Sequence, residues 1–343
     1  MGALLKVSGL NVDFKTHAGF VKAVRGVDFE VARGETLGIV GESGSGKSVT
    51  MMSVTKLLPD NGRVTSGEIV FDGQDLRAAS KARLKAVRGK RISMVFQDPM
   101  TSLNPLLTVG EQIREMLLLH ERGVGLALGK RRALDMMARV KIPDPQRRYH
   151  SYPHEFSGGM RQRVMIAMAL MCSPDLMIAD EPTTALDVTI QAQILKLLSK
   201  LQADFNMSVI FITHDLGVVA GLCARIMVMY GGLVMEQGLT RDIFYTPSHP
   251  YTRGLLGSVP RLDQDKSLRL SPIPGSPPDM LAPPEGCPFW PRCEHARMVC
   301  QSGTPPLFAL TGSHSSRCWL LAEGAPALDN PFYESRAAGG GIQ

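Results

Sequence analysis

Short runs of hydrophobic residues recur along the front part of the chain, and their patterns predict strands. Near the N-terminus apolar and polar residues alternate, as expected for strands that bury one face. Three later runs are apolar throughout, which is typical of strands buried on both faces in a parallel sheet. The predicted strands lie within residues 5–14 and at 27–31, 36–40, 176–179 and 209–212.

Helical patterns separate these predicted strands. Between residues 106 and 140 apolar side chains recur at spacings of three and four, the period of an amphipathic helix. Residues 75–90, 161–172 and 189–203 also have helical patterns. Strands that alternate with helices imply an α/β domain with a largely parallel sheet, which we expect to end near residue 245.

Proline and cysteine divide the chain differently. Of the 23 prolines, 15 follow residue 246, and four of the six cysteines lie between residues 287 and 318. Prolines at this density preclude long helices. We therefore predict an α/β domain over residues 1–245, an extension over residues 246–325 and a flexible tail over residues 326–343.

Charge and hydropathy exclude several classes of protein. The chain has 343 residues, with 38 Lys and Arg against 32 Asp and Glu, and its basic pairs are scattered as on a solvated surface, so we expect no nucleic-acid partner. The longest uncharged apolar run, residues 164–172, is too short to span a bilayer, and the N-terminus has no signal-peptide pattern. We expect a cytoplasmic protein without disulfides, which could work at a membrane only by docking to another protein.

One segment matches the phosphate-loop pattern G-x-x-x-x-G-K-[ST] at every fixed position. It reads Gly41-Glu42-Ser43-Gly44-Ser45-Gly46-Lys47-Ser48. In such a loop backbone N–H groups surround the phosphates, the Lys47 amine reaches the β- and γ-phosphates, and the Ser48 hydroxyl can bind Mg²⁺. A purely structural glycine-rich turn is the alternative, but the segment follows a predicted strand and precedes a helical stretch, as the motif requires. We predict a nucleotide-binding domain.

An acidic pair follows the second buried run. Asp180 at the end of a buried strand can hold Mg²⁺, and the adjacent Glu181 could polarise the attacking water as a general base. An isolated Asp-Glu pair is more often a solvated turn, but its position behind four apolar residues favours the functional interpretation. His214 follows the third buried run and is a candidate for contact with the γ-phosphate.

Several further segments together resemble ABC-transporter ATPases over residues 4–238. Residues 156–163 resemble the LSGGQ signature, with Phe156 in place of Leu and Met160 in place of Gln. Gln97 resembles the Q-loop residue of that family and Asp187 the D-loop residue, and His214 resembles the switch histidine. The glycines of the signature precede a helical run, so their N–H groups form a second anion site.

The resemblance implies a head-to-tail dimer, in which the signature of one subunit caps the γ-phosphate bound by the other. It assigns catalysis to Glu181, Gln97 and His214, and Mg²⁺ to Ser48, Gln97 and Asp180. Phe14 is expected to stack on adenine, with core packing as the alternative. The remaining implied sites are the ATP-binding set Gly41, Glu42, Ser43, Gly44, Ser45, Gly46, Lys47, Ser48 and Val49, and the signature set Ser157, Gly158, Gly159 and Met160.

Other segments are similar to the ATP-binding subunits of oligopeptide, dipeptide and nickel importers. These are residues 98–105, 151–156, 245–252 and 286–293. The likeness implies ATP hydrolysis that energises import of oligopeptides or dipeptides, at the cytoplasmic face of the bacterial inner membrane. The implied partners are two transmembrane permease subunits, a second homologous ATP-binding subunit in a heterodimer, and a periplasmic or extracellular solute-binding protein. Nickel or another peptide-like solute remains an alternative, as does a soluble ABC ATPase without a transport role.

Four cysteines are spaced C-x5-C-x6-C-x17-C in the extension. They are Cys287, Cys293, Cys300 and Cys318. Four thiols in a loop-rich segment of a protein without disulfides suggest a metal site. The resemblance to peptide importers favours a [4Fe–4S] cluster, while zinc and unligated thiols remain alternatives. Cys172 and Cys223 lie in apolar helical settings and are expected to be inert core residues.

Overall fold

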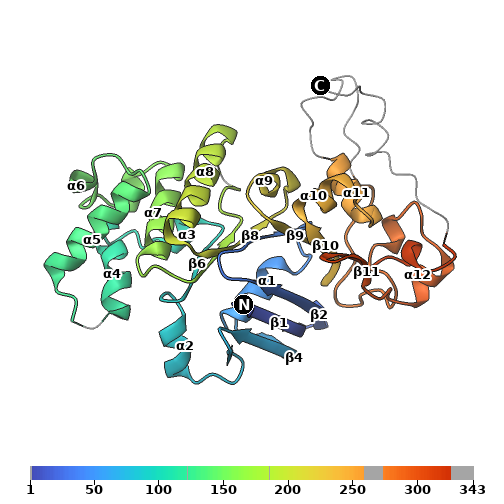
Figure 1. Ribbon diagram of the computed structural model, residues 1–343. Coiled ribbons are helices and arrows are strands. Elements are labelled where there is room, and N and C mark those ends of the chain that lie inside the picture. Colours follow the sequence, from blue (N-terminus) through green and yellow to red (C-terminus); the bar gives the residue numbers. More distant parts are fainter. Residues whose placement is uncertain (1, 122, 185, 259–272, 326–343) are drawn as a thin grey trace, which may run out of the picture. The chain divides into compact units, whose positions relative to one another are not determined.

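The computed structural model describes residues 2–121, 123–184, 186–258 and 273–325, so the predicted tail at residues 326–343 lies outside the described residues. The chain forms two compact units that interleave along the sequence. The first unit contains Val31–Thr36 and Val70–Ile212, together with the N-terminal residues up to Leu5. The second contains Lys6–Glu30, Leu37–Ile69 and the residues from Thr213 onwards (Figure 1).

The first unit has a parallel sheet of buried strands. Its strands are β6 (Ile92–Val95), β7 (Leu176–Asp180) and β8 (Ser208–Thr213), with β7 in the middle. In the ladder Ile178 lies beside both Met94 and Ile210. All residues of β7 and β8 are buried, as the uninterrupted apolar runs predict. The predicted strands at 176–179 and 209–212 are therefore confirmed.

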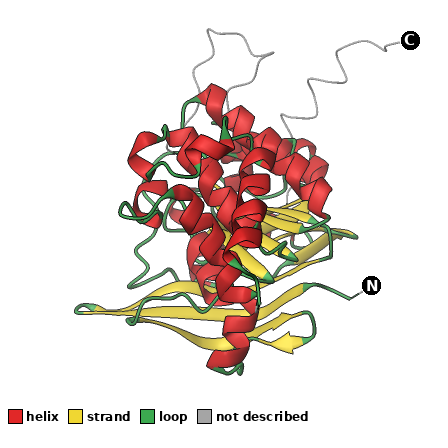
Figure 2. Ribbon diagram, turned by 90° about the vertical axis from the view of Figure 1, so that its left-hand side faces the viewer, coloured by secondary structure: helices red, strands yellow, loops and turns green. Residues whose placement is uncertain are grey.

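Helices of the first unit gather beside this sheet, and they face the viewer in Figure 2. The pattern over residues 106–140 gives two helices, because Gly123 and Gly125 interrupt it. A capping box between Thr108 and Glu111 begins the first of the two. Besides the parallel strands, this unit contains β5 (Gln74–Asp75), α2 (Lys81–Val87), α3 (Pro99–Ser102), α4 (Val109–His120), α5 (Leu126–Arg139), α6 (Pro145–Arg148), η1 (Pro153–Glu155), α7 (Gly158–Leu170) and α8 (Val188–Phe205).

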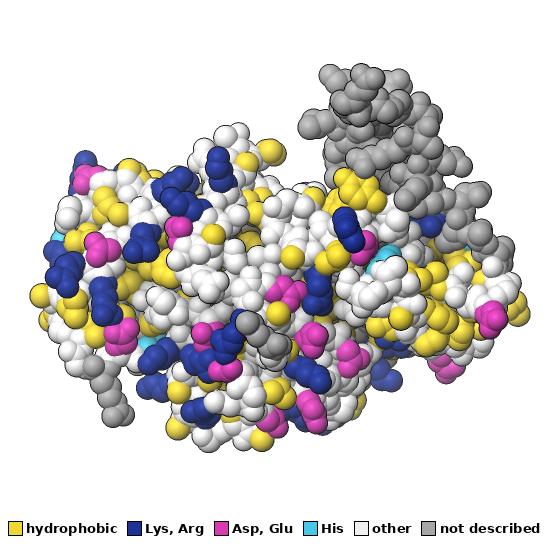
Figure 3. Space-filling view, in the orientation of Figure 1, with side chains coloured by type: hydrophobic (Ala, Val, Ile, Leu, Met, Phe, Trp, Pro, Cys, Tyr) yellow, Lys and Arg dark blue, Asp and Glu magenta, His cyan; other side chains and the backbone are white. Residues whose placement is uncertain are grey.

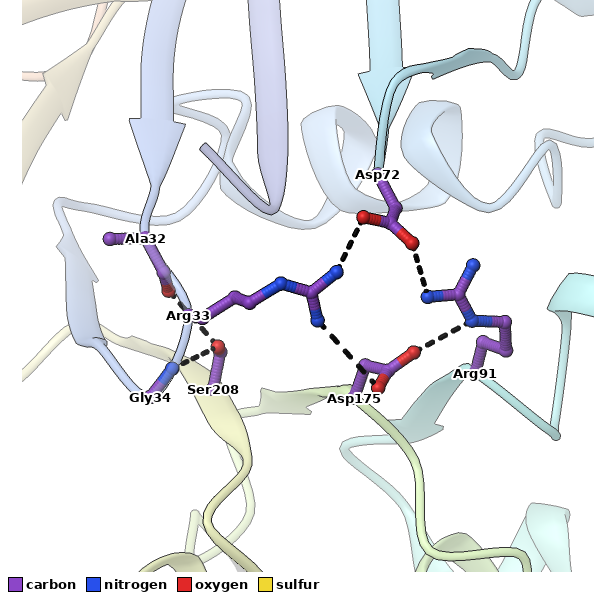
Figure 4. Close-up of polar contacts among 7 residues, drawn as sticks. All are labelled: Ala32, Arg33, Gly34, Asp72, Arg91, Asp175 and Ser208. Atoms are coloured by element: carbon purple, nitrogen blue, oxygen red, sulfur yellow. Dashed lines mark hydrogen bonds and ion pairs between the residues drawn. The ribbon is translucent and has the colours of Figure 1, made fainter. Parts of the chain in front are cut away.

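A ring of ion pairs joins the starts of β6 and β7 to a neighbouring turn (Figure 4). Arg91, just before β6, contacts Asp72 through Nη2 and Asp175 through Nε, each at 2.7 Å. Arg33 pairs with the same two carboxylates from the turn at residues 31–36. Hydrogen bonds from Arg91 and Arg33 lower the pKa of Asp72. The ring therefore fixes the ends at which β6 and β7 begin, and it does not involve their carboxyl ends.

The second unit contains long N-terminal strands and a second set of paired strands. Strand β1 (Leu5–Thr16) lies between β2 (Gly19–Val31) and β4 (Gly62–Phe71). Strand β3 (Thr36–Val40) runs parallel to β9 (Arg225–Tyr230), which pairs antiparallel with β10 (Leu233–Leu239). The helices of this unit are α1 (Lys47–Val54), α9 (Leu216–Ala220), α10 (Thr240–Tyr245), α11 (Pro250–Gly257) and α12 (Met298–Ser302), with the short turns η2 (Trp290–Arg292) and η3 (Trp319–Leu321). Parallel strands alternating with helices confirm the α/β class.

The C-terminal extension continues the pairing of β10. Strand β12 (His314–Ser316) pairs antiparallel with β10, and β11 (Phe308–Thr311) pairs with β12. The fully buried carboxylate of Glu236 in β10 lies 2.8 Å from His314 Nε2 and accepts the backbone N–H of His249 at 3.0 Å. Burial lowers the pKa of His249 to about 4, so its ring is neutral at physiological pH. Buried polar contacts therefore hold the extension to the strands before it.

The described surface is charged but mixed. On the face drawn in Figure 3, Lys and Arg side chains lie among Asp and Glu side chains. Within the described residues no helix combines the length and apolar character needed to cross a membrane.

Candidate functional site

The phosphate loop connects β3 to α1, and its glycines are required by close backbone contacts. A Cβ at Gly41 would lie 2.1 Å from the carbonyl oxygen of Met229, and one at Gly46 would lie 2.6 Å from that of Ala23. Gly46 also has a φ of +100°, which favours glycine. Ser43 and Gly44, in contrast, lie exposed at the tip of the loop. The loop is thus closely packed against other backbone at both ends and is exposed to solvent between them.

Lys47 is the first residue of α1 and has a buried side chain. Its Nζ donates to the carbonyl oxygen of Gly41 at 2.7 Å and to that of Glu42 at 2.9 Å. The amine therefore lies across the loop, next to the N-terminus of α1. Ser48 and Val49 follow it and are half-buried. A positive amine beside a helix N-terminus favours an anion such as a phosphate group.

The acidic pair lies at the carboxyl end of β7 in the first unit. Asp180 is the buried last residue of the strand. Glu181 follows with a φ of +46°, an unusual conformation for a non-glycine residue, and its N–H donates to the carbonyl oxygen of Ile212 at 2.9 Å. Its Oε2 accepts hydrogen bonds from Gln97 Nε2 at 3.1 Å and from Thr184 Oγ1 at 2.8 Å. Two polar neighbours thus aim the Glu181 carboxylate, as a general base requires.

The signature residues begin helix α7, also in the first unit. Ser157 is the N-cap, and its hydroxyl accepts the N–H of Met160 at 3.4 Å. Gly159 packs so closely on helix α8 that a Cβ there would lie 2.6 Å from Ile190 Cγ2. Ser157 and Gly158 are exposed. The first residues at the N-terminus of α7 are therefore accessible to solvent, as a second anion site requires.

Of three other predicted site residues, two lie at the ends of elements and one lies within a strand. Asp187 is the N-cap of α8 and accepts the N–H of Ile190 at 3.0 Å. His214 is exposed and follows the last residue of β8. The ring of Phe14 in β1 covers Gly62, where a Cβ would lie 2.6 Å from its Cε1. The adenine contact of Phe14 stays a prediction.

The four cysteines of the extension are all free thiols in the second unit. Burial is the main cause that raises the pKa of Cys287 to about 12, and the other three cysteines make smaller contributions. The backbone N–H of Cys287 donates to the carbonyl oxygen of Cys300 at 2.9 Å. The thiols therefore lie within electrostatic range of one another. Yet among the described residues no group of three or more Cys, His, Asp or Glu side chains is arranged to hold a metal ion.

Sequence reasoning missed two sets of contacts to predicted site residues. It did not anticipate Thr184, whose hydroxyl donates to Glu181, although that threonine follows the acidic pair closely. It also missed Arg292 and Tyr251, which hold Glu42 of the phosphate loop. No local pattern indicates the second set, because each partner lies more than 200 positions from Glu42.

Comparison with known families gives two matches. The profile described as ABC transporter matches residues 24–184. The profile described as oligopeptide/dipeptide transporter, C-terminal region, matches residues 235–300. The first match covers the phosphate loop and the acidic pair, and the second covers most of the extension.

Relatives and solved structures extend these matches. The dipeptide transport ATP-binding protein DppD of Bacillus subtilis is 54% identical over 93% of this chain and 95% of its own length. The oligopeptide transport ATP-binding protein OppD of Salmonella typhimurium is 53% identical over 93% of this chain and 94% of its own length. The ATP-binding cassette MJ0796, solved as a dimer with ADP and Pi, is similar with a TM-score of 0.63 and 30% identity, over 69% of this chain and 99% of that one.

Proposed function

The chain belongs to the ABC transporter family, among the ATP-binding proteins of oligopeptide and dipeptide transport, and from this we propose that it hydrolyses ATP to energise a peptide importer. The contact of Gln97 and Thr184 with Glu181 is the observation that supports hydrolysis most directly. It places a carboxylate with two orienting partners at the carboxyl end of a parallel strand, where α/β proteins assemble their sites. ATP and Mg²⁺ are the substrate and cofactor of this chemistry.

We assign the other sequence-predicted residues accordingly. Lys47 and the backbone of residues 41–49 bind the phosphates, and Ser48 and Asp180 bind Mg²⁺ together with Gln97. His214 contacts the γ-phosphate, and Phe14 stacks on adenine. Ser157, Gly158, Gly159 and Met160, with Asp187, face the ATP of a second, homologous subunit. The exposed N-terminus of α7 supports this arrangement because it leaves the donors of the signature accessible to a partner.

The segment after Gln97 is the proposed docking surface for the permease subunits. Its side chains Met100 and Leu106 are 63% and 82% exposed, so the segment offers apolar groups that a partner can cover. Helix α3 in this segment packs on α7, and the Arg161 guanidinium contacts Met100 Sδ. The same segment thus touches the signature helix and begins beside Glu181. We place the chain at the cytoplasmic face of the membrane, attached through its permease partners.

Reconstitution with its partners tests the proposed function. The chain, its homologous ATPase subunit, the two permease subunits and the solute-binding protein are assembled in vesicles, and uptake is measured with a panel of di- and oligopeptides. We expect peptide uptake that requires ATP, together with phosphate release. Uptake of nickel alone would favour the alternative solute, and ATP hydrolysis without any membrane partner recovered from native membranes would favour a soluble ATPase.

We further propose that residues 246–325 form an accessory extension of the ATPase domain (residues 1–245), ordered by a [4Fe–4S] cluster at Cys287, Cys293, Cys300 and Cys318. The free state of the four thiols and the backbone hydrogen bond between Cys287 and Cys300 support this donor set. Thiolates are the usual protein ligands of iron–sulfur clusters. When bound, the cluster would cross-link three stretches of a segment that has little apolar core of its own.

Anaerobic purification provides the test of the cluster. The protein should be coloured, with about four iron atoms per chain. Cys287→Ser should lose the iron and the visible absorption, and it should lower the midpoint of thermal unfolding. Cys223→Ser, which alters a buried cysteine far along the chain from this group, should keep both. A colourless protein that holds one zinc ion per chain would contradict the cluster and support the zinc alternative.

A further inference from the structure

The second residue of the phosphate loop is held by the C-terminal extension. The carboxylate of Glu42 accepts two hydrogen bonds from the Arg292 guanidinium, at 2.6 Å from Nη1 to Oε2 and 3.1 Å from Nη2 to Oε1. Its backbone N–H donates to the hydroxyl of Tyr251 at 2.9 Å. Both the side chain and the main chain of Glu42 are therefore fixed by residues of the extension.

Arg292 sits in a site built to hold a guanidinium group. Its side chain is only 6% exposed. Nε donates to the carbonyl oxygen of Pro274 at 2.7 Å, Nη2 to that of Ile273 at 3.1 Å, and Nη1 to the hydroxyl of Tyr230 at 3.0 Å. A buried arginine is tolerated only where its positive charge is neutralised, and the carboxylate of Glu42 supplies the compensating negative charge. The ion pair is thus part of a buried, hydrogen-bonded site and is not a contact between two surface side chains.

Aromatic rings pack against the guanidinium of the Arg292–Glu42 pair. Tyr230, Tyr251 and Phe289 pack together, with ring centroids 4.5–5.4 Å apart. The guanidinium lies over the rings of Tyr230 and Phe289, at 5.7 and 5.9 Å. Phe289 and Arg292 both belong to the segment Cys287–Cys293, which we call the cysteine turn. The position of Arg292 therefore depends on the fold of the cysteine turn.

Glu42 in turn sets the position of the lysine that meets the phosphates. Its carbonyl oxygen accepts a hydrogen bond from Lys47 Nζ at 2.9 Å. A shift of Glu42 would move this acceptor and, with it, the amine and the N–H groups of the loop. Because phosphate binding depends on the aim of these donors, small displacements carry large effects.

We propose that Arg292 is a positioning residue for the phosphate loop, through which the fold of the cysteine turn sets the affinity for ATP. The inference rests on the proposed function in one respect, namely that the loop binds ATP. It adds a dependence of the ATP site on a segment far away in the sequence. The cysteine turn is thereby part of the nucleotide-binding machinery.

A double-mutant cycle on the full-length chain tests the pair. The dissociation constant of a fluorescent ATP analogue with Mg²⁺ is measured for Arg292→Ala, Glu42→Gln and the double variant. Arg292→Ala should weaken binding about tenfold or more, a change of about 1.4 kcal/mol or more. The double variant should bind no more weakly than the weaker single variant, because both changes remove the same contact. Arg292→Lys should rescue part of the loss, since it keeps the charge but not the two-pronged contact.

Two further measurements separate positioning from stability. In the assembled transporter, Arg292→Ala should raise the KM for ATP while kcat at saturating ATP stays close to wild type. Arg91→Ala removes an arginine with two carboxylate partners elsewhere, so it should lower the unfolding midpoint without changing the affinity for ATP.

The inference is overturned if Arg292→Ala binds the analogue within about twofold of wild type, a change of about 0.4 kcal/mol. It is also overturned if the effects of Arg292→Ala and Glu42→Gln multiply fully in the double variant. Absence of peptide uptake by the wild-type transporter would contradict the proposed substrate instead, and leaves the comparison of dissociation constants valid.

Discussion

Replacing Glu181 by glutamine should abolish turnover while ATP still binds. The amide oxygen of glutamine can accept the hydrogen bonds that Gln97 and Thr184 now donate, so the local geometry is kept. What is lost is the negative charge that polarises the attacking water. General-base catalysis contributes about 10²- to 10⁴-fold to a rate, and phosphate release by the assembled transporter should fall by that factor. The dissociation constant for ATP, measured separately, should stay close to wild type.

Glu111→Gln is the matched control for this experiment. Glu111 belongs to the capping box of α4, and its carboxylate contacts Thr108. The same chemical change there should leave hydrolysis close to wild type. Near-normal phosphate release by Glu181→Gln, in the presence of its partners, would refute the general-base assignment.

Gly41→Ala should have the second large effect, on both stability and ATP binding. The added methyl group would lie 2.1 Å from the carbonyl oxygen of Met229, which is backbone and cannot swing aside. Overpacking of this kind costs about 3 kcal/mol. Relief requires the loop to move. A displacement of about 1 Å can cost about 100-fold in rate at a catalytic site, and we expect a comparable loss of affinity for ATP here. Urea unfolding and binding of the fluorescent ATP analogue measure the two effects.

Gly73→Ala separates strain from site geometry. Gly73 has a φ of +74°, but a Cβ there would meet no atom within 4 Å. The variant should therefore lose about 1–2 kcal/mol of stability from the left-handed backbone and keep its affinity for ATP. If Gly41→Ala behaved as Gly73→Ala does, the close contact with Met229 would have no role in shaping the loop.

Much of the fold could be predicted from local patterns. The uninterrupted apolar runs at 36–40, 176–179 and 209–212 are buried strands, because strands buried on both faces need no polar alternation. The phosphate loop, the acidic pair and the signature all follow a strand or begin a helix, where their sequence context predicts them. The short strands β6 and β9 were not predicted, since a few apolar residues carry no clear period. The split of residues 106–140 into two helices was also missed, although Gly123 and Gly125 mark it in the sequence.

The contacts that complete the site could not be found in this way. Glu42 looks like a variable position of the phosphate-loop motif, and Arg292 looks like a charged residue in a proline-rich loop. Their pairing depends on how β9, α11 and the cysteine turn pack together. Such packing depends on the whole second unit, so no short stretch of sequence has a pattern that predicts it.

The distance along the chain between Glu42 and Arg292 also has a consequence for synthesis. The two residues are 250 positions apart, so at about 5–20 residues per second Glu42 leaves the ribosome roughly 12–50 s before its partner is made. During that interval the nascent phosphate loop has neither Arg292 nor Tyr251 to hold it. A translating ribosome therefore exposes an ATPase domain whose nucleotide site is unfinished, and release of a chain truncated before the cysteine turn would leave it so permanently.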